Sequence, residues 1–139
     1  MFPKNIRIII VDDMAAMRLR VVNQLKTMGY ANLVQASNGQ EALTVLERYE
    51  ADKKPFDLII SDWNMPNMSG LDLLKKVKEN SSLSKIPFIM VTAEGEKQQV
   101  VKAVLGGVAD YLIKPVDNEV FKKKMETLGA KYFPNKAAG

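Results

Sequence analysis

The sequence predicts an α/β fold in which five parallel strands form one sheet with helices on both faces. Short apolar runs alternate along the chain with longer segments that repeat apolar residues every three or four positions. These runs are almost continuously apolar, as in strands buried on both sides. Because parallel strands end along one edge of a sheet, where ligands bind, the residues that follow them are expected to converge. Four runs end at polar or charged residues: Asp12-Asp13, Ser61-Asp62, Thr92 and Lys114.

The first strand is predicted over residues 6–11, where four branched aliphatic residues stand in a row. A helix is predicted next, over residues 15–28, and Gly29 suits the position just after its end. The side of this helix that faces the core is expected to carry the regularly spaced apolar residues Met14, Met17, Val21, Leu25 and Met28.

The second strand is predicted over residues 33–36, before the turn-forming sequence Ser-Asn-Gly at 37–39. A second helix over residues 40–50 is expected to turn Ala42, Leu43, Leu46 and Tyr49 inward. The same patterns predict strands over residues 57–61, 87–92 and 110–113, and helices over residues 71–80, 96–105 and 118–130.

Length and composition fit one domain. A chain of 139 residues can bury a core without disulfides, and we expect one domain over residues 1–139, with its core at about 6–130 and a short C-terminal tail. No apolar run approaches the ~18 residues of a membrane span, and the N-terminus lacks the features of a signal peptide. A cytoplasmic location is therefore expected.

The absence of cysteine and histidine restricts any metal site to oxygen ligands, which favour Mg²⁺, Ca²⁺ or Mn²⁺. The net charge is +4, but the lysines are dispersed rather than gathered in a basic stripe. We therefore expect no nucleic-acid or membrane partner. The basic balance can help to recruit an acidic protein.

Right-handed crossovers restrict the strand order, and the order 2-1-3-4-5 places the first and third strands side by side. Asp12, Asp13 and Asp62 then meet at the sheet edge, with Thr92 and Lys114 on the other side of Asp62. Three carboxylates within a few ångströms repel one another by roughly 3 kcal/mol per pair at an effective dielectric constant of about 20. A divalent cation relieves this repulsion, so we interpret the three aspartates as a metal site. Asp13 alone has an alternative role as the N-cap of the following helix.

Asp62 is the natural nucleophile of this group. A carboxylate can attack phosphorus and form an acyl phosphate when cations neutralise the incoming oxygens, and Mg²⁺ and Lys114 would supply that charge. The Thr92 hydroxyl can donate a hydrogen bond to a phosphoryl oxygen. The alternatives are ordinary ones: Lys114 as a salt-bridging surface lysine, and Thr92 as a β-branched strand residue.

In their order and spacing, Asp12-Asp13, Asp62, Thr92-Ala93 and Lys114-Pro115 resemble the receiver domain of bacterial two-component response regulators. The resemblance covers residues 6–130. Within the family, residues 61–68 are most similar to the chemotaxis regulators of the CheY kind. The resemblance implies a doubly wound, flavodoxin-like fold, whose strand order in these regulators is also 2-1-3-4-5.

The resemblance implies a phosphoacceptor and its metal ligands. Asp62 would accept the phosphoryl group from a histidine kinase. Asp13 and Asp62 would bind Mg²⁺ directly, together with the backbone carbonyl of Asn64, and Asp12 would bind it through water.

The resemblance also implies residues that respond to the phosphoryl group. Thr92 and Lys114 would contact it, and Lys114-Pro115 would be a cis peptide. Tyr111 would be the switch aromatic, which turns inward when Thr92 moves toward the phosphate. Asn64 and Glu94 would tune how fast water attacks the acyl phosphate.

On this basis we expect a stand-alone signalling switch that catalyses its own phosphorylation and dephosphorylation but is not a classical enzyme. The signal would leave through a surface formed by the fourth helix, the fifth strand and the fifth helix. The expected partners are a CheA-like histidine kinase, the flagellar motor switch or another downstream protein, and optionally a phosphatase. The protein is expected to be a monomer.

Three alternatives stay open at this point. One is a phosphorelay intermediate, or the receiver of another two-component pathway. A second is an aspartyl-phosphate phosphohydrolase, which needs a general acid where Asn64 stands. A third is a flavodoxin-like nucleotide binder, although acids at positions 12 and 13 repel phosphate unless a metal intervenes. One departure from the family is Ser69 in place of the common Asp before Gly70, which is expected to change only the cap of the third helix.

Overall fold

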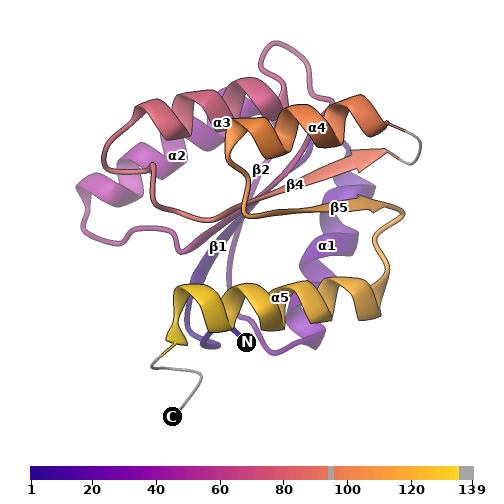
Figure 1. Cartoon of the computed structure of the whole chain (residues 1–139). Helices are drawn as coiled ribbons and strands as arrows, with labels where there is room; N and C mark the ends of the chain where they lie inside the picture. The colour runs from indigo at the N-terminus through magenta and orange to yellow at the C-terminus, as the bar shows by residue number, and fades with distance from the viewer. Residues whose placement is uncertain (94–95, 135–139) are drawn as a thin grey trace.

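Five parallel strands form one sheet in the order β2-β1-β3-β4-β5, with helices packed on both faces (Figure 1). The computed structural model describes residues 1–93 and 96–134. The strands are β1 (Arg7–Val11), β2 (Asn32–Ala36), β3 (Leu58–Asp62), β4 (Phe88–Ala93) and β5 (Asp110–Lys114). The helices are α1 (Ala15–Thr27), α2 (Gly39–Ala51), α3 (Gly70–Glu79), α4 (Lys97–Gly106) and α5 (Asn118–Tyr132). The predicted fold class and strand order are confirmed.

The sheet divides the core into two apolar clusters, because successive strand residues point to opposite faces. Ile8 and Ile10 of β1 pack in the cluster beneath α1 and α5, whereas Ile9 and Val11 pack in the cluster beneath α2, α3 and α4. Figure 1 shows α1 and α5 on one side of the sheet and the other three helices on the opposite side. The central strands β1, β3 and β4 are therefore buried on both faces, as their continuous apolar character predicts, whereas the edge strands β2 and β5 are partly exposed.

The inward side of α1 differs from the prediction at its start. Met14 is 57% exposed, because it is the N-cap residue and precedes the first turn of the helix. The side chains buried by α1 are Val21, Val22, Gln24 and Leu25. Met28 is the C-cap, and Gly29 follows it with φ = 103°, as expected for a glycine just past a helix end.

The core also includes residues that precede β1. Phe2 is 1% exposed, and its ring packs edge-on against Phe133 with 5.6 Å between ring centroids. The buried hydroxyl of Tyr30 donates a hydrogen bond to the carbonyl oxygen of Phe2 at 3.1 Å, and burial raises the pKa of Tyr30 to about 12. Gly129 of α5 permits this arrangement, because a Cβ there would lie 2.1 Å from the nitrogen of Phe2.

The helix that follows β3 begins with a capping box. The Ser69 hydroxyl accepts a hydrogen bond from the amide of Asp72, and the Asp72 carboxylate accepts one from the amide of Ser69. Ser69 therefore caps α3, as predicted. Within residues 1–93 and 96–134, no helix has the length and apolar character needed to cross a membrane.

Candidate functional site

The strand register brings the predicted site residues to one edge of the sheet. Val11 pairs with Ser61 and Asp62 pairs with Val91, so Asp12 and Asp62 stand at the carboxyl ends of adjacent strands. On the far side of β4, Ala93 pairs with Lys114 at the end of β5. Residues that are widely separated in the sequence thus meet beyond the ends of β1, β3 and β5.

Three carboxylates form the acidic part of the site. Asp12, Asp13 and Asp62 each offer an oxygen atom, and these atoms lie within 4.8 Å of one another. Asp12 and Asp62 are both 5% exposed, whereas Asp13 faces solvent. The N-cap of α1 is Met14, so Asp13 does not serve as the helix cap considered as its alternative. The predicted cluster is therefore assembled, with an open side at Asp13.

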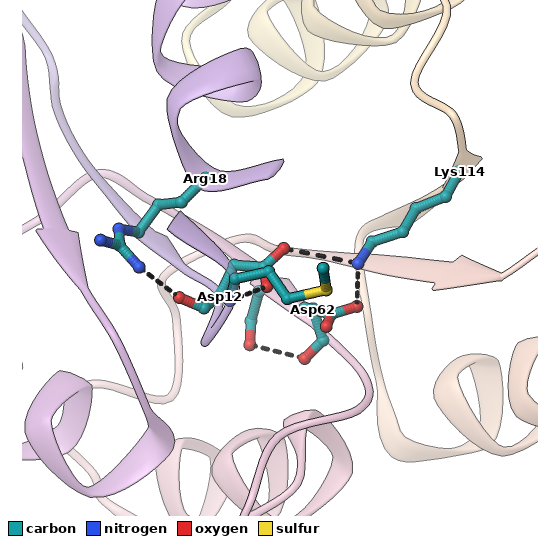
Figure 2. A network of polar contacts seen from close by, with 6 residues as sticks. Asp12, Arg18, Asp62 and Lys114 are labelled. Carbon is teal, nitrogen blue, oxygen red and sulfur yellow. Dashed lines mark hydrogen bonds and ion pairs between the residues drawn. The ribbon is translucent and has the colours of Figure 1, made fainter. Parts of the chain in front are cut away.

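One ammonium group joins the two buried carboxylates (Figure 2). The Nζ atom of Lys114 lies 3.0 Å from Oδ1 of Asp62 and 3.4 Å from Oδ2 of Asp12. The other oxygen of Asp12 accepts a hydrogen bond from the amide of Met14 at 2.9 Å. Lys114 is followed by a cis peptide bond to Pro115, as the resemblance to receiver domains implies. The Lys114 side chain is therefore directed at the carboxylates rather than into solvent.

The site carries more negative charge than the Lys114 ammonium neutralises. Burial raises the pKa of the Asp62 carboxyl, and the charge of Asp12 adds to this effect, against the hydrogen bond and the charge of Lys114. Burial lowers the pKa of Lys114, but its hydrogen bond to Asp62 and the charges of both aspartates outweigh this and leave that pKa raised. An additional cation beside Asp62 would therefore relieve an existing repulsion.

Thr92 offers a buried hydroxyl without a partner. It is the penultimate residue of β4 and is fully buried, and its Oγ1 atom makes no hydrogen bond to any described residue. Buried hydroxyl groups are normally hydrogen-bonded, since leaving one unpaired costs about 1–3 kcal/mol. The Thr92 hydroxyl is therefore available to a ligand that reaches this end of β4.

Tyr111 and Asn64 lie around this centre. Tyr111 precedes Lys114 by three residues on β5, is half-buried, and packs against the apolar cluster beneath α2, α3 and α4. Asn64 is exposed in the loop after β3 and lines an open depression together with Asp13 and Trp63. Glu94, also singled out in the sequence, lies outside the described residues.

The structure adds Arg18 to the predicted set. In Figure 2 this side chain reaches back from α1, and its Nη1 atom donates a hydrogen bond to the carbonyl oxygen of Asp12 at 2.7 Å. Its Nε atom donates to Gln35 of β2 at 2.9 Å. No sequence signal identifies this role, because an arginine on an amphipathic helix is typical of a solvated face.

Gly70 also belongs to the site, at the start of α3. A Cβ atom at this position would lie 2.3 Å from the carbonyl oxygen of Asp62, so only glycine lets α3 approach so closely. Its amide donates a hydrogen bond to the carbonyl oxygen of Trp63 at 2.8 Å. The backbone of Asp62 is thus held by a contact that a larger residue would break.

These groups match the needs of phosphoryl chemistry. Carboxylate oxygens are the ligands that Mg²⁺ prefers, and the exposed side at Asp13 leaves room for further oxygen ligands. Asp62 can act as a nucleophile, while the Lys114 ammonium and the Thr92 hydroxyl can stabilise oxygens of a transferred group. Position 64 carries an amide, which cannot serve as a general acid.

Comparison with known proteins agrees with this arrangement. Residues 8–126 match the protein family described as the response regulator receiver domain. The chain is 38% identical to the chemotaxis protein CheY-3 of Vibrio cholerae, over 90% of this chain and 92% of that protein. It is 42% identical to the chemotaxis protein CheY1 of Helicobacter pylori, over 88% of this chain and 95% of that protein.

Solved structures show the same likeness. The chemotaxis protein CheY4 of Vibrio cholerae superposes with a TM-score of 0.75 at 32% identity, over 88% of this chain and 98% of that one. A response regulator from Chloroflexus aurantiacus superposes with a TM-score of 0.81 at 27% identity, over 91% and 99% of the two chains. The family match at residues 8–126 spans the strand ends that carry the acidic cluster.

Proposed function

The chain belongs to the response regulator receiver domain family, and we propose that it is a single-domain, cytoplasmic switch phosphorylated on Asp62 by a histidine kinase. Members of this family are generally signalling switches rather than classical enzymes. The observation that carries the proposal is the joint position of Lys114, Asp62 and Asp12, with the Thr92 hydroxyl unpartnered nearby.

Asp13 and Asp62, the Asn64 carbonyl and, through water, Asp12 would hold Mg²⁺ in this proposal. Bound there, the ion supplies positive charge that neutralises the phosphoryl oxygens. The three converging carboxylates and the raised pKa of Asp62 support this assignment, because both favour an added cation.

The transfer joins Asp62 to the donor's phosphoryl group, at a site that would hold Mg²⁺. A carboxylate oxygen of Asp62 attacks the phosphorus of a phosphohistidine, the P–O bond forms, and the P–N bond to the imidazole breaks. Lys114 turns from its ion pair with Asp62 to the new phosphoryl oxygens, and the Thr92 hydroxyl donates to one of them. Tyr111 then turns inward and changes the surface beside it.

Apolar side chains on that surface support an output to a downstream protein. They include Leu105 (81%), Val104 (58%) and Val101 (57%) of α4, and Ile113 (45%) of β5. We propose the flagellar motor switch as the downstream protein and a CheA-like kinase as the donor, because the chain resembles proteins named for chemotaxis. A phosphorelay or another two-component pathway is the alternative, which binding to the motor switch protein would exclude.

The test is intact-mass spectrometry after incubation with acetyl phosphate. We expect one phosphoryl adduct in the wild-type protein with Mg²⁺, and none with a chelator or in Asp62→Asn. Fluorescence of Trp63, the only tryptophan, should change over the same time course and return when the donor is removed. A stable, Mg²⁺-dependent adduct in Asp62→Asn would overturn the assignment of Asp62.

A further inference from the structure

Two charged residues hold Tyr111 from three directions. The Nζ atom of Lys124, on α5, lies 4.3 Å from the centroid of the Tyr111 ring and donates a hydrogen bond to the Tyr111 carbonyl oxygen. The same ammonium pairs with Oδ1 of Asp110 at 3.0 Å. That carboxylate oxygen also accepts a hydrogen bond from the Tyr111 amide at 2.8 Å. The ring, the amide and the carbonyl of one residue are thus bound by one ion pair.

Of the three consecutive lysines at 122–124, Lys124 is the one that makes these contacts. Lys122 and Lys123 are exposed, whereas Lys124 is half-buried and faces β5. An ammonium held over an aromatic face is attracted by the electrons of the ring, and this attraction depends on where the ring stands. The backbone bonds of Tyr111 can persist when the ring turns, but the contact between the ammonium and the ring cannot.

We propose that Asp110 and Lys124 form a clamp that sets the resting orientation of the Tyr111 ring. Lys124 is then a positioning residue for Tyr111, and Asp110 holds the ammonium in place. The proposal rests on the proposed function, in which phosphorylation at Asp62 turns this ring. The clamp opposes that turn in the unphosphorylated protein and so lowers the fraction of molecules that present the output surface without a signal.

The experiment is fluorine NMR of protein labelled with 3-fluorotyrosine. The chain has four tyrosines, and the signal of Tyr111 is identified by its loss in Tyr111→Phe. The unphosphorylated variants Lys124→Gln and Asp110→Asn are compared with Lys123→Gln, a matched control at an exposed lysine of the same helix. Lys124→Arg retains the cation and tests rescue.

We expect the Tyr111 signal to move in Lys124→Gln and Asp110→Asn toward its position in phosphorylated wild-type protein. The ratio of turned to resting rings should rise about five-fold, a size usual for the loss of a cation–π contact and a partly exposed ion pair. In the double variant, which carries Lys124→Gln and Asp110→Asn, this ratio should equal that in Lys124→Gln alone. Lys124→Arg should return the Tyr111 signal most of the way to its wild-type position. Lys123→Gln and the signals of the other tyrosines should not change.

A Tyr111 signal that keeps its wild-type position in both Lys124→Gln and Asp110→Asn would overturn the clamp. The same samples are examined by intact mass after treatment with acetyl phosphate and Mg²⁺. Normal phosphorylation with an unmoved Tyr111 signal contradicts the clamp alone. Absence of any adduct in wild-type protein contradicts the proposed function instead.

Discussion

Asp62 combines burial with two neighbouring carboxylates, and one ammonium offsets them. The Lys114 contacts at 3.0 and 3.4 Å do not fully offset the burial of Asp62 and the repulsion from Asp12, since the pKa of Asp62 stays above its ordinary value. The same residue is therefore both the proposed nucleophile and a source of instability in the folded protein. Such a conflict is usual where function rather than stability selects the residue.

We predict that Asp62→Asn raises the free energy of unfolding by about 1 kcal/mol at neutral pH with a chelator present. A raised pKa means that the folded state binds the proton more tightly than the unfolded state. The penalty is therefore absent below the ordinary range of a carboxyl group and grows as pH rises through the raised pKa. Urea unfolding at several pH values measures this difference, which should vanish in acid.

Glu126→Gln, at an exposed position of α5, is the control and should unfold like the wild type at every pH. Addition of Mg²⁺ should stabilise the wild-type protein more than Asp62→Asn, because binding to the folded state adds to its stability. A variant that is less stable than the wild type at neutral pH would contradict this account of the charge balance.

The aspartates could be identified from sequence because strand ends meet at one edge whatever the details of packing. Arg18 could not be, because a bond from a side chain to the backbone carbonyl of Asp12 leaves no pattern in either residue type. The contacts of Lys124 with Tyr111 could not be predicted from sequence either, since nothing distinguishes three adjacent lysines until the rotation of α5 about its axis is known.

At the scale of elements, the start of α3 restricts the backbone position of Asp62. Helix periodicity and the strand patterns predict every element, but they also place Met14 on the core-facing side of α1. In the structure Met14 is the N-cap of α1 and is exposed. This error has a physical cause. The regular spacing of apolar residues continues beyond the residue at which the helical backbone begins, so spacing alone does not locate the helix end. The close approach of Gly70 to Asp62 depends on how α3 packs on β3, which the sequence pattern does not specify.

We predict that Gly70→Ala destabilises the protein by about 2 kcal/mol and slows phosphorylation, because its Cβ would force the Asp62 carbonyl away. Gly106→Ala, at the end of α4, is the matched control. There the tight contact of a Cβ would be with a side-chain carbon of Leu74 at 2.8 Å, not with backbone, and a side chain can shift more easily than a carbonyl group held in the sheet. Urea unfolding and the rate of the Trp63 fluorescence change measure both effects. Equal stability and equal rates in the two variants would exclude the steric explanation.

At the scale of the molecule, the N-terminal residues and α5 close one apolar cluster together. Phe2 packs with Phe133 across Gly129, so the stability of the whole depends on a contact between distant parts of the chain. We predict that Phe2→Ala lowers the free energy of unfolding by about 3 kcal/mol, as expected for a buried phenylalanine. Leu105→Ala is the control, because Leu105 is 81% exposed and its loss should change stability by less than about 0.5 kcal/mol.

Thermal and urea unfolding of the two variants provide the comparison. A loss in Phe2→Ala no larger than that in Leu105→Ala would show that the N-terminal segment contributes nothing to the core.

The pairing of Phe2 with α5 has a consequence for synthesis on the ribosome. Phe2 is translated before the five strands and α5 after them, so the cluster that contains Phe2 and Tyr30 lacks α5 while the sheet is being made. The cluster beneath α2, α3 and α4 draws on no residue of α5 and can close earlier. A nascent chain would therefore expose the apolar cluster of Phe2, after the other cluster has closed, until α5 is translated and packs on it.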